Sequence, residues 1–438
     1  MTKAPRYAST RDASRCEVPF RQALLNALAP DGGLYVPTRI PRLPASRLPS
    51  ATFADLAVEV LGEWLAGEFP GEVLEAVARQ ALDFRVPLVR LEDELFVLEL
   101  FHGPTLSFKD FGARVMARLL NHCLEEMGER ITILVATSGD TGSAVAAGFA
   151  GLEHVRVVLL YPEGRVSEVQ ERQLIVDRPG VQPFRVAGDF DACQRLLKEA
   201  FRDPALKSLR LSTANSINVG RLLPQTLYYL WAVQGATGGG ERTAMAQPTF
   251  VVPSGNLGNL TAGLLARAMC GADWHLVAAH NANDFFPDYL TGREEAYRFR
   301  TTVATLSNAM DVGAPSNFER LNAMFEDELA TAVWGTSVDD AATRSRMRSV
   351  FGAKGYVACP HTAVGLEAAT RFSAGARVGG PVVTLATAHP AKFPDVVAEV
   401  LGTSAPRSER LESLRHAETR VRTIRPDLAE LREHLLGC

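Results

Sequence analysis

TFVVPSGNLGNLTAGLLARAM (249–269) contains an apolar run, a glycine-rich turn and a second, longer apolar segment in direct succession. The run TFVVPS (249–254) is bounded by turn residues, which is typical of a short buried strand. NLTAGLLARAM (259–269) has the length and pattern of a helix. A strand that passes through a tight turn into a helix is the repeating unit of parallel sheets. The stretch therefore predicts an α/β domain.

The same order of elements recurs along the chain, although the sequence itself contains no internal repeat. ITILVAT (131–137) precedes the helical GSAVAAGFAG, VRVVLLYP (155–162) precedes the helix-like SEVQERQL, and PVVTLAT (381–387) lies near the C-terminus. Fully apolar strands separated by helices favour mainly parallel sheets that are covered on both faces. Ligands in such sheets bind where loops leave the carboxyl ends of the strands.

Length and composition limit the class of protein. The chain has 438 residues, of which 47% are hydrophobic and 22% are charged, which predicts a globular protein of roughly two to four domains. A net charge of −4 gives no general attraction to nucleic acid or to an anionic membrane. We find no apolar stretch near the roughly 20 residues of a membrane helix, and the first 16 residues lack the apolar core of a secretory signal.

The six cysteines are scattered, and none forms a CxxC pair. This spacing disfavours a zinc site, a redox motif and a disulfide framework. We therefore expect buried, reduced thiols, no metal and a cytoplasmic location.

Lys109 lies in FHGPTLSFKDFGARVMARLLNHCLEEMG (101–128), where apolar residues after the lysine recur with the spacing of one helical face. The lysine is thus expected near a helix N-terminus, where the dipole repels positive charge. That repulsion lowers the pKa of the ammonium group and favours the neutral amine that Schiff-base chemistry requires. The alternative is a surface lysine whose stem packs on Phe108 or Phe111.

The loop Ser254–Asn259 (SGNLGN) joins the strand and the helix of the opening stretch. Its glycines allow close approach of the backbone to an anion, and the following helix offers free amides and a positive dipole end. The spacing matches neither a P-loop nor the dinucleotide fingerprint GxGxxG. We interpret the loop as a phosphate site, with a plain tight β–α turn as the alternative.

Two further clusters could bind anions. TSGDTGS (137–143) offers hydroxyls and amides that suit a carboxylate, or it is an N-cap cluster. Asp140 in this cluster would fit better against a cofactor hydroxyl or an iminium. In NSINVGR (215–221), Arg221 can bind a phosphate or carboxylate in bidentate fashion, or the segment is a polar turn before a helix.

TAHPAKF (387–393) follows the last predicted strand. The Thr387 hydroxyl at the end of the strand could hydrogen-bond a ring nitrogen without carrying charge. His389 and Lys392 follow it, and His102 precedes the lysine motif. Because single residues of these types are more often structural, we assign none of the three a chemical step.

Together these segments resemble the threonine synthase family, of the longer type found in bacteria and fungi. The resemblance runs in order through APDGGLYVP (29–37), FHGPTLSFKDFGAR (101–114), TSGDTGSA (137–144), GDFDACQ (188–194), NSINVGRLLPQ (215–225), SGNLGNLTAGLLA (254–266), TLSNAMDVGAPSN (305–317) and TAHPAKFPD (387–395). It implies the pyridoxal 5'-phosphate (PLP) fold type II, which is like that of tryptophan synthase β. This fold has two parallel-sheet α/β domains with a cleft between them and a small N-terminal domain. We expect the N-terminal domain at residues 1–90, the large PLP-binding domain at 91–125 and 236–438, and a smaller mobile domain at 126–235.

The resemblance also implies a role for each motif. Lys109 would be the catalytic Schiff-base lysine, and Thr387 would meet the pyridine nitrogen. Asp140 would lie beside the ring oxygen, where related enzymes carry Asn. The remaining cofactor contacts, to the phosphate, would come from Gly255, Asn256, Leu257, Gly258 and Asn259. The substrate phosphate would be held by Thr105, Asn215, Ser216 and Arg221, and the substrate carboxylate by Ser138, Gly139 and Thr141. Leu257 departs from the family pattern, which often has Phe, and we expect little consequence.

The implied reaction converts O-phospho-L-homoserine and water to L-threonine and phosphate by PLP-dependent γ-elimination and β-hydration (EC 4.2.3.1), the last step of threonine biosynthesis. The nearest alternative is a related PLP-dependent phospholyase or dehydratase that releases a 2-oxo acid and ammonia. A silent PLP-binding regulator is disfavoured because the lysine and both glycine loops are present, and a nicotinamide dehydrogenase because GxGxxG is missing. We expect a monomer or small homo-oligomer that acts on a small molecule, without a nucleic-acid or membrane partner.

Overall fold

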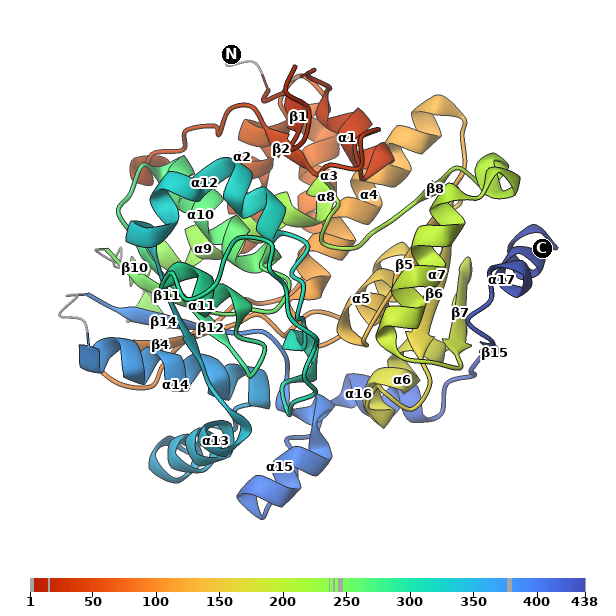
Figure 1. The fold of residues 1–438 in the computed structure, drawn as a ribbon. Coiled ribbons are helices and arrows are strands. Elements are labelled where there is room, and N and C mark those ends of the chain that lie inside the picture. Colours follow the sequence, from red (N-terminus) through yellow and green to blue (C-terminus); the bar gives the residue numbers. More distant parts are fainter. Residues whose placement is uncertain are drawn as a thin grey trace.

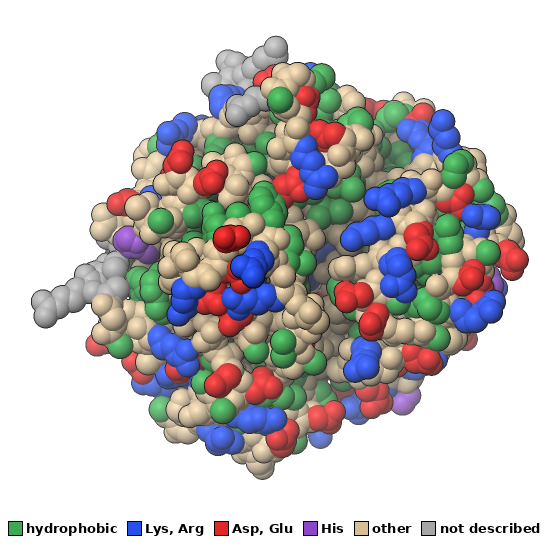
Figure 2. Space-filling view, viewed as in Figure 1, with side chains coloured by type: hydrophobic (Ala, Val, Ile, Leu, Met, Phe, Trp, Pro, Cys, Tyr) green, Lys and Arg blue, Asp and Glu red, His purple; other side chains and the backbone are tan. Residues whose placement is uncertain are grey.

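Two parallel sheets organise the chain into two lobes (Figure 1). The computed structural model describes residues 4–14, 16–235, 237–238, 241–242, 247–375 and 380–437. The larger sheet lies on the left in Figure 1 and the smaller sheet on the right. On the face shown in Figure 2, a hollow separates the two lobes. The predicted α/β architecture with mainly parallel sheets is therefore confirmed.

The larger sheet has six strands, in the order β13 (Val333–Ser337), β12 (His275–His280), β11 (Thr249–Pro253), β14 (Val382–Ala386), β4 (Leu95–Glu99) and β3 (Leu88–Arg90). All neighbours are parallel except β3, which runs antiparallel to β4. Phe250 and Val252 of β11 enter the main core, whereas Val251 enters a second core on the opposite face. The sheet is thus buried on both sides, as the apolar strand at 249–254 predicted.

Helices cover both faces of this sheet. The main core receives α9 (Thr226–Val233), α10 (Gly258–Cys270), α11 (Phe285–Leu290) and α12 (Phe318–Ala332). The opposite face is covered by α13 (Asp340–Lys354), α14 (Pro360–Gly375) and α15 (Pro394–Leu401).

The smaller sheet is entirely parallel, in the order β15 (Arg422–Ile424), β7 (Val181–Val186), β6 (Val155–Pro162), β5 (Ile131–Ala136) and β8 (Leu211–Ser212). One face packs against α7 (Phe190–Arg202) and α17 (Leu428–Leu436). The other packs against α5 (Asp140–Phe149), while α6 (Glu168–Ile175) and α16 (Glu409–Arg415) lie near the edge toward the larger lobe.

The N-terminal part packs on the long helix α4 (Lys109–Met127), which runs between the lobes. It consists of the antiparallel pair β1 (Tyr7–Ser9) and β2 (Tyr35–Pro37), with α1 (Phe20–Asn26), α2 (Phe53–Leu65) and α3 (Gly71–Ala81). Helix α4 ends at Gly128, whose φ of 65° is the left-handed conformation that commonly terminates helices. Short elements complete the chain: α8 (Val219–Leu222), the pair β9 (Thr237–Gly238) and β10 (Glu241–Arg242), and 3₁₀ turns that include Asn308–Met310 and Pro390–Lys392.

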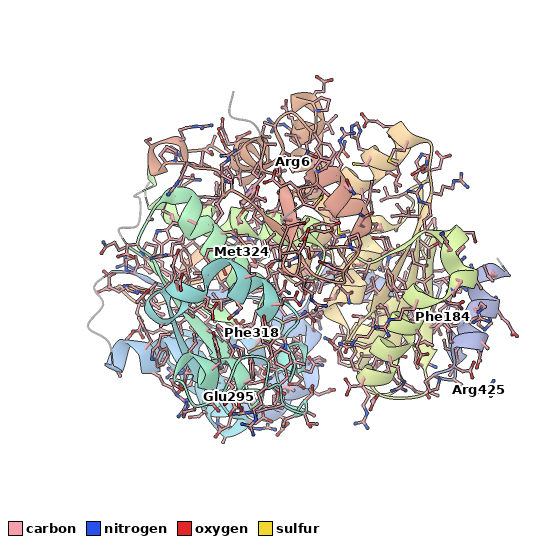
Figure 3. The ribbon with its side chains drawn as sticks, turned by 45° about the horizontal axis from the view of Figure 1, so that its top comes forward. Arg6, Phe184, Glu295, Phe318, Met324 and Arg425 are labelled. Atoms are coloured by element: carbon pink, nitrogen blue, oxygen red, sulfur yellow. The ribbon has the colours of Figure 1, made fainter. Side chains whose placement is uncertain are left out.

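Strand pairing departs from the predicted division into domains at two places. β15 pairs with β7 of the smaller sheet and α17 packs against that sheet, although residues 236–438 were expected in the large domain. Figure 3 labels Phe184 of β7 and Arg425, just after β15, on the same lobe. Burial of Ile424 beside β7 gives this pairing its apolar contact. β3, expected in the N-terminal domain, forms the edge of the larger sheet. The domain boundaries otherwise stay a prediction.

No helix among the described residues is long and apolar enough to cross a bilayer. No group of three or more His, Cys, Asp or Glu side chains within the same residues is placed to hold a metal ion.

Candidate active site

The lysine motif and the end of β14 are joined by backbone hydrogen bonds, although they lie far apart in the sequence. The amide of Phe108 donates to the carbonyl of Thr387 at 2.9 Å, and the amide of His389 donates to the carbonyl of Leu106 at 3.0 Å. These bonds place Lys109, the first residue of α4, beside the carboxyl end of the larger sheet. The site therefore lies where ligands bind in parallel sheets.

The side chain of Lys109 is partly buried and has no hydrogen-bond partner among the described residues. Its Nζ lies 4.8 Å from the centre of the Phe108 ring. Burial, together with the nearby charges of Arg221 and Lys392, lowers the pKa of Lys109 to about 8, and the charge of Asp140 opposes this effect. An amine with such a pKa both accepts and releases protons near neutral pH, which suits nucleophilic attack and proton transfer.

One cavity brings all the predicted cofactor contacts together. It is lined by Lys109, Asp140, Thr387 and residues 255–259, and also by Ser216, Arg221 and His361. Helix α10 begins at Gly258, so the free amides of its first turn and its positive dipole end belong to this loop. Leu257 turns the chain into the helix with a φ of 60°, which non-glycine residues seldom adopt. The loop is therefore built to present backbone donors to an anion.

Gly255 lets the loop lie directly against another backbone segment. A Cβ at this position would be 2.8 Å from Met310 Cα and 3.1 Å from the Met310 carbonyl oxygen. Because backbone atoms cannot move aside as a side chain can, residue 255 must be glycine in this arrangement.

Asn259 presents an unsatisfied donor in the cavity. Its Oδ1 accepts hydrogen bonds from the hydroxyls of Tyr228 at 2.6 Å and Tyr229 at 2.8 Å. These bonds fix the amide orientation and leave Nδ2 buried without a partner. A buried donor without an acceptor is costly, so this donor set fits a bound phosphate.

The segment 215–221 lies against the same loop. The side-chain Nδ2 of Asn256 donates to Ser216 Oγ at 2.7 Å, and Nδ2 of Asn317 donates to the same oxygen at 3.1 Å. The buried guanidinium of Arg320 donates to the carbonyl of Ser216 at 3.3 Å and to the side chain of Asn317. Two of the three segments that the sequence suggested as anion sites, 215–221 and 254–259, are thus neighbours.

Arg221 is a buried cation without a carboxylate partner among the described residues. Its guanidinium donates to the carbonyl of Ala214, and its Nε is buried without a partner. Burial lowers its pKa to about 10. A charge in this situation is costly unless an anion joins it. Asn215, in contrast, donates to the carbonyl of Ala136 at 3.4 Å and does not line the cavity.

The turn at 137–143 is held by Thr137, whose Oγ1 accepts from the amides of Gly139 at 3.0 Å and Gly142 at 2.8 Å. Asp140 of this turn lines the cavity. The three residues predicted to bind the substrate carboxylate lie on the same turn outside the cavity lining: Ser138, Gly139 and Thr141. Their role stays a prediction.

Thr105 is buried, and its polar groups are bonded within the protein. Its hydroxyl donates to Asp110 at 2.7 Å, and its amide donates to the same carboxylate at 2.8 Å. Its carbonyl accepts from Lys392 at 3.0 Å and from Gln173 at 3.1 Å. The predicted contact of Thr105 with a substrate phosphate is untested, and this geometry gives it no free donor.

Two residues that sequence reasoning missed also lie at the site. His361, near the start of α14, accepts from the amide of Ala309 at 3.1 Å, and burial lowers its pKa to about 4, so its ring is neutral. Gln170 of α6 donates to Asp140 at 3.0 Å and accepts from Asn308 at 3.2 Å. Neither residue belongs to a motif with a recognisable spacing, so no sequence signal marks them.

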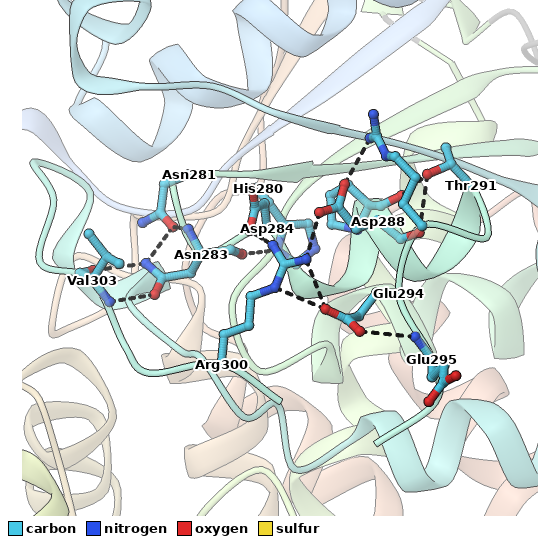
Figure 4. A network of polar contacts seen from close by, with 12 residues as sticks. His280, Asn281, Asn283, Asp284, Asp288, Thr291, Glu294, Glu295, Arg300 and Val303 are labelled. Carbon is cyan, nitrogen blue, oxygen red and sulfur yellow. Dashed lines mark hydrogen bonds and ion pairs between the residues drawn. The ribbon is translucent and has the colours of Figure 1, made fainter. Parts of the chain in front are cut away.

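The loop between α11 and α12, which carries Met310, is braced by a polar network (Figure 4). Arg300 forms ion pairs with Asp284, Asp288 and Glu294. Arg300 Nη2 lies 2.8 Å from Asp288 Oδ2 and 3.0 Å from Glu294 Oε2. This network ties Arg300 of the loop to α11 and the residues that flank it.

Three family models match the chain over nearly its whole length. "Threonine synthase N terminus" matches residues 6–82, "Pyridoxal-phosphate dependent enzyme" matches residues 82–388, and "Threonine synthase, C-terminal" matches residues 362–435. Among curated proteins, the threonine synthase of Haemophilus influenzae is 39% identical over 424 residues and that of Escherichia coli is 38% identical over 427 residues. Each alignment covers 96% of this chain and 97% of the relative.

Solved structures give the same result. The threonine synthase of Escherichia coli superposes with a TM-score of 0.88 at 36% identity, covering 99% of both chains. A PLP-bound threonine synthase from Brucella melitensis has a TM-score of 0.88 at 34% identity, again covering 99% of both chains. The yeast enzyme also has a TM-score of 0.88, at 31% identity, covering 100% of this chain and 99% of the yeast chain. The similarity thus includes the N-terminal part and both lobes.

Proposed function

The chain belongs to the threonine synthase family of PLP-dependent lyases (EC 4.2.3.1), and from this premise we propose that it converts O-phospho-L-homoserine to L-threonine and phosphate in the cavity around Lys109. One observation carries the assignment. A partly buried lysine with a lowered pKa, an anion-binding loop and a buried guanidinium with an unused Nε donor line the same cavity. Such a cavity offers donors for anions beside a reactive amine.

The residues present fit PLP. The amides of residues 255–259 and Nδ2 of Asn259 would hold its phosphate, and the hydroxyl of Thr387 would bind its ring nitrogen. Asp140 would bind its ring oxygen, and Lys109 Nζ would supply the amine that holds the cofactor covalently. When bound, PLP supplies an electron sink for the carbon that carries the substrate amine.

The substrate phosphate binds to Arg221 and Ser216. Both residues line the cavity, and Arg221 has the buried, unused Nε donor that an anion requires. Ser138, Gly139 and Thr141 hold the substrate carboxylate on the neighbouring turn. Asn215 and Thr105 have weaker support, because neither lines the cavity and the Thr105 hydroxyl already donates to Asp110.

Lys109 moves the protons of the reaction. With its Nζ free, Lys109 would take the proton from Cα, pass it to an oxygen of the substrate phosphate, and then take the proton from Cβ. Phosphate would leave from Cγ with the bonding electrons, and Lys109 would deliver the Cβ proton to Cγ. Water would then add its hydroxyl group to Cβ, and its other proton would pass through Nζ to Cα. A pKa of about 8 allows Nζ to act in both directions.

Two measurements test this assignment. Holoenzyme incubated with O-phospho-L-homoserine should release L-threonine and phosphate in equal amounts, with little 2-oxobutyrate. Lys109→Ala should abolish turnover together with the visible absorbance of covalently held cofactor. Retention of that absorbance in Lys109→Ala would contradict the central assignment, and 2-oxobutyrate as the main product would contradict the proposed reaction.

We also propose that the protein acts in the cytoplasm as a monomer or small homo-oligomer without a nucleic-acid partner. All groups named above come from one chain, and the net charge is −4. Light scattering after size-exclusion chromatography tests the oligomeric state, since a large assembly would contradict it.

A further inference from the structure

A buried ion pair joins the two sheets of the molecule at the edge of the active-site cavity. Lys392 lies in the 3₁₀ turn after β14 of the larger sheet, and Asp140 opens α5 after β5 of the smaller sheet. Lys392 Nζ is 2.6 Å from Asp140 Oδ1, and the two side chains are 0% and 5% exposed. Both residues are therefore removed from water, and each is the other's charge partner.

Additional hydrogen bonds satisfy both ends of the pair. Lys392 donates to the carbonyl of Thr105 at 3.0 Å, and Gln170 donates to the carboxylate of Asp140 at 3.0 Å. Buried ion pairs are tolerated when their geometry is good and further hydrogen bonds support both charged groups. Removal of one partner leaves an uncompensated charge, which is far more costly than removal of both.

The charges around the pair determine the ionisation of Asp140, which lines the cavity. Lys109 from α4, Lys392 from the turn after β14 and His361 from α14 interact electrostatically with Asp140, and Arg221 from α8 acts on Lys109. Burial alone would raise the pKa of Asp140, but the charge and hydrogen bond of Lys392, with smaller contributions from His361 and Gln170, lower it below its ordinary value. The carboxylate therefore stays ionised next to Lys109.

We propose that Lys392 is a positioning residue that holds the ionised carboxylate of Asp140 in place, so that the pair presents a group without net charge to the cofactor ring and clamps the smaller sheet to the larger one. The first part rests on the proposed function, which places Asp140 at the ring oxygen. The clamp rests on the ion pair alone and can be measured in the cofactor-free protein.

The pair predicts opposite effects of its two single substitutions. Loss of the positive charge in Lys392→Met leaves a net negative charge near Lys109, which favours the protonated form of the Lys109 nitrogen. Loss of the negative charge in Asp140→Asn leaves a net positive charge, which favours the deprotonated form. The double variant Asp140→Asn/Lys392→Met removes both charges and restores neutrality. In all three variants Lys109, Arg221 and His361 remain.

The first experiment titrates the visible absorbance of each holoenzyme against pH. We expect the midpoint to rise by about one pH unit in Lys392→Met, to fall in Asp140→Asn and to return toward the wild-type value in the double variant. Turnover should fall roughly tenfold to a hundredfold in Lys392→Met and recover partly in the double variant and in Lys392→Arg. A purely structural lysine would not produce opposite spectroscopic shifts.

The second experiment measures thermal unfolding of the cofactor-free proteins. Lys392→Met should unfold at a lower temperature than the double variant, although the double variant carries one more substitution. Lys354→Met is the matched control, because Lys354 pairs with Glu92 at 3.3 Å at the surface, and its loss should change neither the unfolding temperature nor the titration. If Lys392→Met fails to fold, Lys392→Arg and the double variant still test the pair.

The outcomes separate this proposal from the proposed function. A double variant no better than Lys392→Met in unfolding, or single variants whose spectroscopic midpoints move in the same direction or stay fixed, would overturn the role of Lys392. Failure of the wild-type protein to make threonine would overturn the proposed function, while the unfolding comparison would still decide whether the clamp exists.

Discussion

Gly112, one turn after Lys109 on α4, packs directly against Arg221 of α8. A Cβ on Gly112 would lie 2.6 Å from the carbonyl oxygen of Arg221 and 3.0 Å from its Nε. The helix that carries the reactive lysine therefore also positions the buried guanidinium. This contact fixes the spacing between the amine and the proposed substrate phosphate.

Gly112→Ala should displace Arg221, because the nearest atom belongs to the backbone. We expect a raised KM for O-phospho-L-homoserine and a loss of about 1–3 kcal/mol in the free energy of unfolding, as for overpacked interiors. Steady-state kinetics and urea unfolding measure these changes. Gly62→Ala is the control, since a Cβ at Gly62 in α2 meets nothing within 4 Å. That substitution should stabilise the helix by about 0.5–1 kcal/mol and leave KM unchanged. Equal behaviour of the two variants would contradict the interpretation.

Arg221→Met should remove the binding site of the substrate phosphate without unfolding the protein. Inorganic phosphate should raise the Tm of the wild-type holoenzyme, because it binds the folded state, and should not raise that of the variant. In the absence of phosphate, we expect the variant to be at least as stable as the wild type, since a buried cation with its pKa lowered to about 10 is lost. The exposed Arg90→Met serves as the control and should keep the response to phosphate. A phosphate-dependent Tm in Arg221→Met would place the anion elsewhere.

The parts of the fold that the sequence predicts are those with strong local patterns. The apolar runs that became β5, β6, β11 and β14 are recognisable because both of their faces are buried. β15 has no such signal, because Ile424 alone of its three residues is buried and its partner strand is distant in the sequence. Its place in the smaller sheet therefore depends on tertiary packing.

The same distinction applies to the candidate site. Lys109 at a helix N-terminus and the loop at 254–259 follow from local sequence. The pairing of Lys392 with Asp140 joins two motifs that local patterns treat separately, and Gln170 contributes from a helix with no functional motif. Such contacts depend on how the two sheets meet, which no local spacing encodes.

The pKa of Lys109 makes the stability of the cofactor-free protein depend on pH. Its folded value of about 8 lies below the ordinary 10.5, so the unfolded chain binds more protons between these values and stability rises with pH. Relative to Lys109→Met, the wild type should carry a penalty of about 3 kcal/mol at pH 7.5 and about 1.5 kcal/mol at pH 9.5. Urea unfolding of both proteins at the two pH values measures the difference. A penalty that does not shrink with pH would show that Lys109 is not desolvated as described.

Gly255→Ala should weaken cofactor binding through the backbone of the phosphate loop. Its Cβ would lie 2.8 Å from Met310 Cα, and the neighbouring Asp311 is held by hydrogen bonds from Asn281 and Thr305, so residues 255–259 should shift instead. We expect the Kd of PLP, measured from the absorbance of reconstituted protein, to rise about tenfold or more, because the loop donors no longer converge on one point. Gly352→Ala in α13 is the control, since its Cβ would meet nothing within 4 Å. Unchanged PLP affinity in Gly255→Ala would mean that the cofactor phosphate does not depend on this loop.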